Sequence, residues 1–342
     1  MKAIFFEQHG GIEVLKYADL PNPEPKPGEA LIRVRAVALN HLDIWVRRGW
    51  EGLQLTMPHI GGCDIAGEIV AVNAESSWKA GERVIVNPGI ITADDEWTRR
   101  GEENISPAYK TIGVQRPGGF AEYVCVPISN VFKLPDSVSY EEGAAPLLVG
   151  MTCWRMLFRR AQLQPGETLL VVGAGGGVNS LAIVFAKACS ATVIALTSSK
   201  KKAEQAYKLG CNHVINYKEN PHWPLQVMKL TQGRGVDIVL DNVGAKTFAR
   251  SLRTVRPGGR LVTVGATSGY DVKLDSRLVF AKHISVLGST MGSRQDFIDA
   301  MQFMWANRLK PVIDTVEPLK KGIEMIQYLE EGKQFGKIVL KP

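Results

Sequence analysis

The chain has 342 residues, of which 45% are apolar and 22% charged, and its formal net charge is +7. A chain of this length is long for one domain and comfortable for two, since domains usually contain about 100–200 residues. The composition excludes a disordered chain, and no apolar run approaches the ~20 residues that span a bilayer, so we expect no membrane span.

The N-terminus, the cysteines and the charge indicate where the protein is located and what kind of ligand it binds. The start MKAIFFEQHGG has no sustained apolar core before Glu7, unlike a secretory signal, so a cytoplasmic location is expected. The five cysteines are scattered without a C-x-x-C pair, which argues against a disulfide framework. Basic residues form no run of five or more, so a small anionic ligand explains the charge better than a nucleic acid does.

The first part of the chain, residues 1–135, is expected to be a β-rich domain. Its short β-rich runs are bounded by Pro, Gly or Asn, as strands between turns are. The clearest are EALIRVRAVAL (29–39), AGEIVAVN (66–73), ERVIVNPG (82–89) and AEYVCVP (121–127).

From residue 136 the pattern changes to alternating strand-like and helix-like segments. Ser139, followed by Glu141 and Glu142, is a plausible helix start. The expected strands are 167–174, 191–196, 213–217, 236–242, 260–266 and 283–290, and the expected helices are 179–190, 200–210 and 245–259. Such alternation predicts a parallel sheet with right-handed crossovers, covered by helices on both faces. We expect this second domain over residues 136–294, with a tail from about 295 to 342 packing back on the first.

A glycine-rich turn follows the first of these strands and precedes a helix. A structural turn that needs φ > 0 is one reading, but the strand–turn–helix setting favours a dinucleotide pyrophosphate at the helix N-terminus. The spacing departs from G-x-G-x-x-G only where Val178 stands in place of the third glycine. The expected contacts are Gly173, Ala174, Gly175, Gly176, Gly177 and Val178.

The next strand ends in IALTSSKKKAE, where an acid would select NAD by binding the ribose 2′-hydroxyl. No carboxylate precedes the lysines, and hydroxyl and ammonium groups suit a 2′-phosphate instead. A solvated basic helix start is the alternative, although cations there oppose the helix dipole. We therefore expect NADP(H), bound by Ser198, Ser199, Lys200 and Lys202.

Several motifs together resemble the medium-chain dehydrogenase/reductase superfamily over essentially the whole chain. They are PEPKPGEALIRVRAVALNHLD, GGCDIAGEIVAV, GERVIVNPG, GGFAEYVCVP, LQPGETLLVVGAGGGV and the terminal GKIVL. The resemblance implies an α/β fold with a GroES-like β-rich catalytic domain and a doubly wound parallel-sheet Rossmann domain.

The resemblance also implies further cofactor positions. Tyr217 resembles the family tyrosine near the adenosine phosphate, and the ends of the fourth and fifth strands collect cofactor contacts. The terminal segment resembles the family's last cofactor-contacting stretch, although Phe335 is equally typical of a core residue. These expected contacts are Tyr217, Asn242, Val243, Gly265, Ala266, Thr267, Phe335 and Lys337.

In length and loop layout the chain resembles the zinc alcohol dehydrogenase branch, but the zinc ligands are missing. The branch carries four structural cysteines at intervals of three, three and eight after a segment like NPG. Here those places hold Thr92, Asp95, Thr98 and Ser106, so we expect no structural zinc. We expect hydrogen bonding to hold the lobe.

The catalytic zinc positions change in the same way. The branch has a cysteine where this chain has Asn40, a histidine at Cys63 and an acid at Asp64, with a further ligand near Leu147 and Leu148. Cys63 and Asp64 supply two ligands at most, whereas catalytic zinc normally takes three from the protein. We expect no metal, and an Asn in ALNHLD is what the zinc-independent quinone oxidoreductase branch shows.

Four residues are candidates for catalysis. Asn40 is the first candidate donor to a substrate oxygen, or else a structural amide. His41 could contact cofactor phosphates or supply a proton, Asp43 would orient neighbouring groups, and Cys63 is either part of the site or a small core residue.

Without a metal, a quinone or α,β-unsaturated carbonyl is the easier hydride acceptor, because the charge it gains is delocalised. We expect an NADPH-dependent reductase of such small molecules. Open alternatives are an alcohol or aldehyde dehydrogenase with residual zinc, held by Cys63, Asp64 and a ligand such as His59; an enoyl-thioester reductase; and a non-catalytic NADPH-binding sensor. The last strand, 283–290, would leave an edge that family members pair, so a homodimer or homotetramer is expected.

Overall fold

The computed structural model describes all 342 residues and divides into two compact units. The first contains residues 1–151, 292–301 and 310–342, and the second contains residues 152–291 and 302–309. No helix has both the length and the apolar character that a membrane span requires.

The first unit is built on a seven-stranded sheet with the order β10-β6-β5-β3-β18-β17, and β9 also pairs with β3. Its strands are β3 (Glu29–Ala38), β5 (Asp64–Asn73), β6 (Arg83–Val86), β9 (Tyr123–Pro127), β10 (Val131–Lys133), β17 (Ile313–Pro318) and β18 (Lys337–Lys341). Strands β1 (Lys2–Phe6), β2 (Lys16–Asp19) and β4 (His59–Ile60) form a second sheet, and β7 (Gly89–Ile90) pairs with β8 (Lys110–Thr111). All four strands expected in residues 1–135 are present.

Short helices connect these strands. They are α1 (His41–Arg48), α2 (Glu96–Arg99), α3 (Tyr140–Ala144), α11 (Gly322–Glu330) and the 3-10 turns η1 (Ile12–Val14), η2 (Glu103–Ile105), η3 (Ile128–Asn130) and η5 (Leu319–Lys321). Helix α3 packs on β3 and β5, which places residues 136–151 with the first unit rather than with the second, where the sequence pattern put them. The chain passes between the units after residue 151 in α4 (Leu147–Trp154), after residue 291, after residue 301 in α10 (Arg294–Ala306) and after residue 309.

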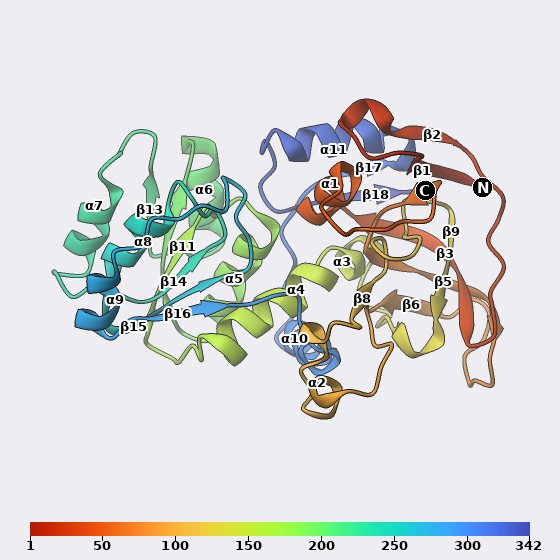
Figure 1. Ribbon diagram of the computed structural model, residues 1–342, viewed down its shortest axis with the longest axis horizontal. Helices are drawn as coiled ribbons and strands as arrows, with labels where there is room; N and C mark the ends of the chain where they lie inside the picture. Colours follow the sequence, from red (N-terminus) through yellow and green to blue (C-terminus); the bar gives the residue numbers. More distant parts are fainter. The chain divides into compact units, whose positions relative to one another are not determined.

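The second unit is a six-stranded, fully parallel sheet with the order β13-β12-β11-β14-β15-β16, which confirms the expected doubly wound fold. Its strands are β11 (Thr168–Val172), β12 (Thr192–Thr197), β13 (His213–Asn216), β14 (Val236–Asp241), β15 (Val255–Thr263) and β16 (Ser285–Gly288). Figure 1 shows its helices arranged around these strands: α5 (Gly177–Ala188), α6 (Lys200–Lys208), α7 (Trp223–Leu230), α8 (Phe248–Thr254) and α9 (Ser276–Lys282). A π-helical turn, η4 (Arg155–Arg160), leads into the unit.

Two of these elements differ from the sequence pattern. The sequence pattern did not predict helix α7. It begins at Trp223, and Pro224 lies in its first turn, where the missing N–H of proline costs no helical hydrogen bond. Residues 255–259 belong to strand β15 rather than to the end of the preceding helix, and the register with β14 shifts there.

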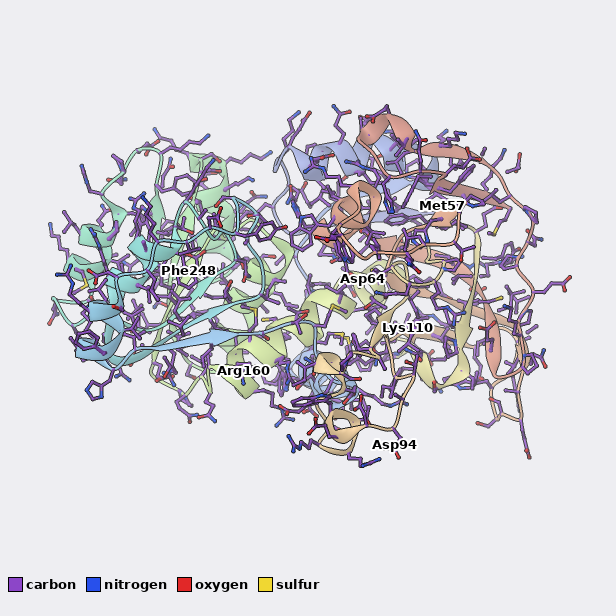
Figure 2. The ribbon with its side chains drawn as sticks, in the orientation of Figure 1. Met57, Asp64, Asp94, Lys110, Arg160 and Phe248 are labelled. Carbon is purple, nitrogen blue, oxygen red and sulfur yellow. The ribbon has the colours of Figure 1, made fainter.

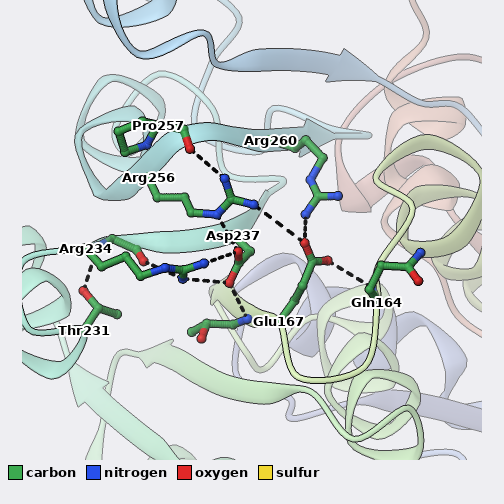
Figure 3. Close-up of polar contacts among 10 residues, drawn as sticks. Gln164, Glu167, Thr231, Arg234, Asp237, Arg256, Pro257 and Arg260 are labelled. Carbon is green, nitrogen blue, oxygen red and sulfur yellow. Dashed lines mark hydrogen bonds and ion pairs between the residues drawn. The ribbon is translucent and has the colours of Figure 1, made fainter.

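An ion network holds together the amino ends of three strands of this unit (Figure 3). The Asp237 carboxylate accepts hydrogen bonds from the guanidinium groups of Arg234 and Arg256, at 2.8 Å and 2.5 Å, and from the Thr168 backbone at 2.8 Å. Glu167 accepts a hydrogen bond from Arg260 beside it. These contacts tie the amino ends of β11, β14 and β15 together.

Candidate functional site

Three adjacent strands of the first unit bring three distant polar residues together. Lys337 begins β18, Asn40 follows β3, and Asp64 begins β5. The sheet order places β18 beside β3 and β3 beside β5, with Ala38 opposite Asp64 and the Leu39 N–H bonded to the Ile338 carbonyl. Asp64 is labelled in Figure 2.

The three side chains form a closed set of hydrogen bonds. The Lys337 ammonium donates to Asn40 Oδ1 at 2.6 Å and to Asp64 Oδ2 at 2.8 Å, and Asn40 Nδ2 donates to Asp64 Oδ2 at 2.9 Å. The other carboxylate oxygen accepts the Leu148 N–H at 2.8 Å. All three residues are buried, with at most 5% of the residue exposed, so the charges are paired where water cannot solvate them.

These contacts fix which way the Asn40 amide faces. Lysine offers only donors and a carboxylate only acceptors, so the amide oxygen must face Lys337 and the nitrogen must face Asp64. A flipped amide would place N–H groups against the ammonium. One N–H of Asn40 Nδ2 donates to Asp64, and the second has no acceptor in the protein.

Asp43 lies beside this set and is buried. Its two carboxylate oxygens accept the backbone N–H groups of Asn40, at 2.7 Å, and of Gly62, at 3.2 Å. Burial raises the pKa of Asp43 from 3.8 to about 7, which these hydrogen bonds and Lys337 only partly oppose. Asp43 therefore orients the loop that carries Asn40, as the sequence suggested.

The other two catalytic candidates differ in burial. His41 is half-buried on α1, its ring 5.1 Å from that of Trp45, and burial lowers its pKa. Cys63 is completely buried, and burial raises the pKa of its thiol well above the usual value, with Asp43 and Asp64 adding to the rise.

The residues at the catalytic zinc positions do not fit zinc. Asn40 and Lys337 occupy Asp64 Oδ2, and Leu147 and Leu148 bring no ligating side chain. His59, the alternative ligand, bonds to the Gly113 carbonyl at 3.1 Å and packs against Phe6. No three His, Cys, Asp or Glu side chains gather anywhere in a metal-binding arrangement.

The lobe at the structural zinc positions is held by hydrogen bonds. The Asp95 carboxylate caps α2 by accepting the N–H groups of Trp97 and Thr98, both at 2.9 Å, and it also accepts the Ser106 hydroxyl. The Thr98 hydroxyl bonds back to the Asp95 backbone. Three of the four positions thus bond to one another, and Thr92 separately donates to the Ala108 carbonyl.

The same lobe attaches to the start of α10 within the first unit. The Glu103 carboxylate accepts the Arg294 backbone N–H, where the helix dipole favours a negative charge. The Tyr109 hydroxyl donates to the Gly292 carbonyl at 3.3 Å, and it approaches so close to Gly89 that a Cβ there would collide with it. These contacts were not apparent from the sequence.

In the second unit, the glycine-rich turn fits a pyrophosphate. Gly173 has φ +83°, a conformation that favours glycine, and Gly176 is the N-cap of α5. No side chain caps the first turn of α5, so its N–H groups are available to an anion. The sequence-predicted residues lie at this turn, between β11 and α5: Gly173, Ala174, Gly175, Gly176, Gly177 and Val178.

Asn179, which the sequence analysis missed, braces this turn. Its Nδ2 donates to the carbonyls of Val172 and Gly173, at 2.7 Å and 2.8 Å, and its Oδ1 accepts from Asn242 Nδ2 at 2.9 Å. Asn242 in turn accepts the Val264 N–H at 2.9 Å. A buried Asn two residues after the glycines was the only available signal, and asparagine there is compatible with an ordinary helix start.

The remaining cofactor candidates of this unit follow the carboxyl ends of its strands. Ser198, Ser199, Lys200 and Lys202 lie between β12 and the first turn of α6, where the Ser199 hydroxyl accepts the Lys202 N–H at 3.2 Å. Tyr217 follows β13 and is 40% exposed. Asn242 and Val243 follow β14, and Gly265, Ala266 and Thr267 follow β15, with the Thr267 N–H bonded to the Asn242 carbonyl. The parallel topology gathers them at one edge.

Phe335 and Lys337 lie in the first unit instead, and their side chains are directed into it. Phe335 is 2% exposed and its N–H bonds to Asp314, while the Lys337 ammonium is taken up by Asn40 and Asp64. Strand β18 pairs with β3 and so brings Lys337 to the buried carboxylate, while the cofactor contact expected for Phe335 and Lys337 stays a prediction.

Comparisons with known proteins agree with both units. The model of an alcohol dehydrogenase GroES-like domain matches residues 26–136, and that of a zinc-binding dehydrogenase matches residues 177–306. An NAD-dependent alcohol dehydrogenase of Sulfurisphaera tokodaii is 34% identical, over 96% of both chains, and the quinone oxidoreductase of Homo sapiens is 28% identical, over 99% of this chain and 97% of the relative. A crystal structure of an NAD-dependent alcohol dehydrogenase superposes with a TM-score of 0.95, at 40% identity and full coverage of both chains.

Proposed function

Because this chain belongs to the medium-chain dehydrogenase/reductase superfamily and is an oxidoreductase that uses a nicotinamide dinucleotide, we propose that it reduces a quinone or α,β-unsaturated carbonyl with NADPH and without zinc. The set Asn40, Asp64 and Lys337 carries this proposal. It fills the catalytic metal positions with an amide and an ammonium, neither of which binds zinc at neutral pH.

The proposed chemistry follows from what a metal-free site can stabilise. Zinc holds a developing alkoxide, a contribution of several kcal/mol that this site must replace. An acceptor that delocalises the incoming charge as a hydroquinone anion or enolate needs only a few hydrogen bonds. When bound, NADPH supplies the hydride with its electron pair, and a proton from solvent completes the reduction.

The chain's own residues would position the reactants. The second N–H of Asn40 Nδ2 donates to the substrate oxygen, and Asp43 holds the Asn40 backbone. In the second unit the N–H groups of the glycine-rich turn hold the pyrophosphate, while Asn179 and Asn242 brace the turn. His41 is exposed enough to contact a phosphate or to pass a proton.

Lysines at the start of α6 support NADPH over NADH. Lys200, Lys201 and Lys202 follow the end of β12 with no acid before them, and the Lys202 backbone N–H donates to the hydroxyl of the cap residue Ser199. Two relatives of this chain are named NAD-dependent alcohol dehydrogenases. We infer that the lysines at the start of α6 give this chain a preference for NADPH over NADH.

Alcohol or aldehyde oxidation is the second candidate function, because relatives at 34% identity are named alcohol dehydrogenases. It would require a carbonyl to be polarised by hydrogen bonds alone. An enoyl-thioester reductase or a non-catalytic NADPH-binding sensor would share the same cofactor edge, and substrate turnover separates them.

We also propose that the chain pairs with a second copy through β16, as a homodimer or a dimer of dimers. Strand β16 pairs only with β15, so its other edge is open, and the nearby Val286 and Phe280 are 42% and 67% exposed. An exposed edge with apolar neighbours is a site at which another strand can add.

The deciding experiment combines elemental analysis of the purified protein with NADPH oxidation by quinones, enones, enoyl thioesters and aldehydes. We expect no stoichiometric zinc and turnover of quinones or enones. Stoichiometric zinc with alcohol-dependent reduction of NADP⁺ would contradict the proposal, and tight NADPH binding without turnover of any acceptor would favour the sensor.

A further inference from the structure

The Lys337 ammonium has an environment unlike that of a cofactor-binding lysine. It is 4% exposed and makes two hydrogen bonds, both to residues of its own unit. A cation so buried must be kept paired, because its desolvation cost is met only by its partners. Lys337 is therefore committed to Asn40 and Asp64.

The pairing of Lys337 fixes the orientation of the Asn40 side-chain amide. An asparagine amide turns easily about its last bond, and its two ends are nearly the same size, so without polar partners both orientations are populated. The Lys337 ammonium can donate only to the amide oxygen, and the Asp64 carboxylate can accept only from the amide nitrogen, while the Leu148 N–H keeps the carboxylate itself in place. One N–H of Asn40 Nδ2 is then left in a fixed direction.

We propose that Lys337 is a positioning residue of the reaction, which through Asn40 Oδ1 holds the carboxamide so that its remaining N–H donates to the carbonyl oxygen of the substrate. This inference rests on the proposed reduction of a quinone or enone. It gives Lys337 a role toward the substrate rather than toward the cofactor, and a donor held in advance lowers the barrier without reorganisation during the reaction.

The test compares Lys337→Met, Asn40→Ala and the double variant, with Lys320→Met as a matched control because Lys320 is an exposed lysine of the same unit with no ion pair. We expect kcat to fall about 100-fold in Asn40→Ala and about tenfold in Lys337→Met, with the Kd for NADPH unchanged. If Lys337 acts through Asn40, the double variant loses no more than Asn40→Ala alone.

A second measurement separates positioning from loss of structure. Across quinones of graded reduction potential, kcat of Lys337→Met should depend more steeply on the potential, because the charge on the oxygen is less well stabilised. Partial misfolding would lower all rates equally. Where Lys337→Met is too unstable to purify, Lys337→Met with Asp64→Asn removes both buried charges and should show the same steeper dependence.

The outcomes are distinct. Additive losses of kcat in the double variant would overturn the positioning role. An effect of Lys337→Met confined to the Kd for NADPH would also overturn it and would indicate that Lys337 binds the cofactor. Unchanged kcat in Lys337→Met with normal turnover by the wild-type protein would overturn this inference alone. No turnover of quinones or enones by the wild-type protein would overturn the proposed function and this inference with it.

Discussion

The Ser106 hydroxyl donates a hydrogen bond to the Asp95 carboxylate, and both residues stand at positions where the zinc branch of the family carries cysteine. The lobe keeps its length, and one carboxylate at its centre gathers two backbone N–H groups and a hydroxyl. Hydrogen bonds thus connect three positions that a metal would otherwise connect.

Asp95→Ala should lower the free energy of unfolding by about 1–2 kcal/mol, the usual cost of removing a helix cap, with a further loss from the Ser106 hydroxyl. Asp94→Ala is the control, since Asp94 makes only an exposed ion pair with Arg99. Denaturant unfolding measures both. A chelator should leave the wild-type Tm unchanged, and a fall in Tm would show that the lobe does bind a metal.

The raised pKa of Asp43 predicts a pH-dependent stability. Because its pKa is about 7 in the folded protein and near 3.8 when unfolded, its contribution is fully present below about pH 4 and is lost as pH rises through 7. A shift of about three units corresponds to ~4 kcal/mol. The groups that face it are Asp64 and Cys63, and the opposing cation is Lys337.

Asp43→Asn isolates this effect, because asparagine cannot ionise. The free energy of unfolding of the variant minus that of the wild type should increase between pH 4 and pH 8. Asp271→Asn, at an exposed aspartate of the second unit, is the control. A pH-independent difference for Asp43→Asn would mean that the Asp43 carboxylate keeps its ordinary pKa.

Asp237→Asn should destabilise the second unit by about 3 kcal/mol, because it leaves Arg234 and Arg256 without the carboxylate that pairs them. The neighbouring arginines and the Thr168 N–H hold the pKa of Asp237 well below its usual value, so its contribution is present at neutral pH and is lost in acid. Urea unfolding at pH 7 and pH 3 measures this, with Asp271→Asn as control. Equal losses at both pH values would contradict the ionic origin.

Lys200→Glu with Lys202→Glu should lower kcat/KM for NADPH by about 10- to 100-fold while affecting NADH much less, since only NADPH carries the 2′-phosphate. Lys208→Glu is a matched control at the other end of α6. Steady-state kinetics with both cofactors gives the ratio. An equal loss for both, or no change, would show that these lysines do not read the 2′-phosphate.

The sequence by itself determined that the chain has a β-rich unit and a parallel-sheet unit, although not where they meet, and the edge of the parallel sheet at which most cofactor candidates gather. A strand is recognised by the spacing of its apolar residues and by its β-branched and aromatic residues, and both are properties of the segment itself. Strands β3 and β5 and the strands of the parallel sheet could therefore be predicted from their own residues. The glycine-rich turn, and the absence of cysteine at Thr92, Asp95, Thr98 and Ser106, are likewise properties of single positions.

Only the tertiary structure decided what Lys337 does. In sequence it lies in a terminal strand far from Asn40 and Asp64, where the family resemblance implies a cofactor contact. The order of strands β18, β3 and β5 places the three residues side by side, and burial then requires that the ammonium, the amide and the carboxylate satisfy one another. Strand order and burial arise from pairing across the whole sheet, which no single segment of the sequence contains.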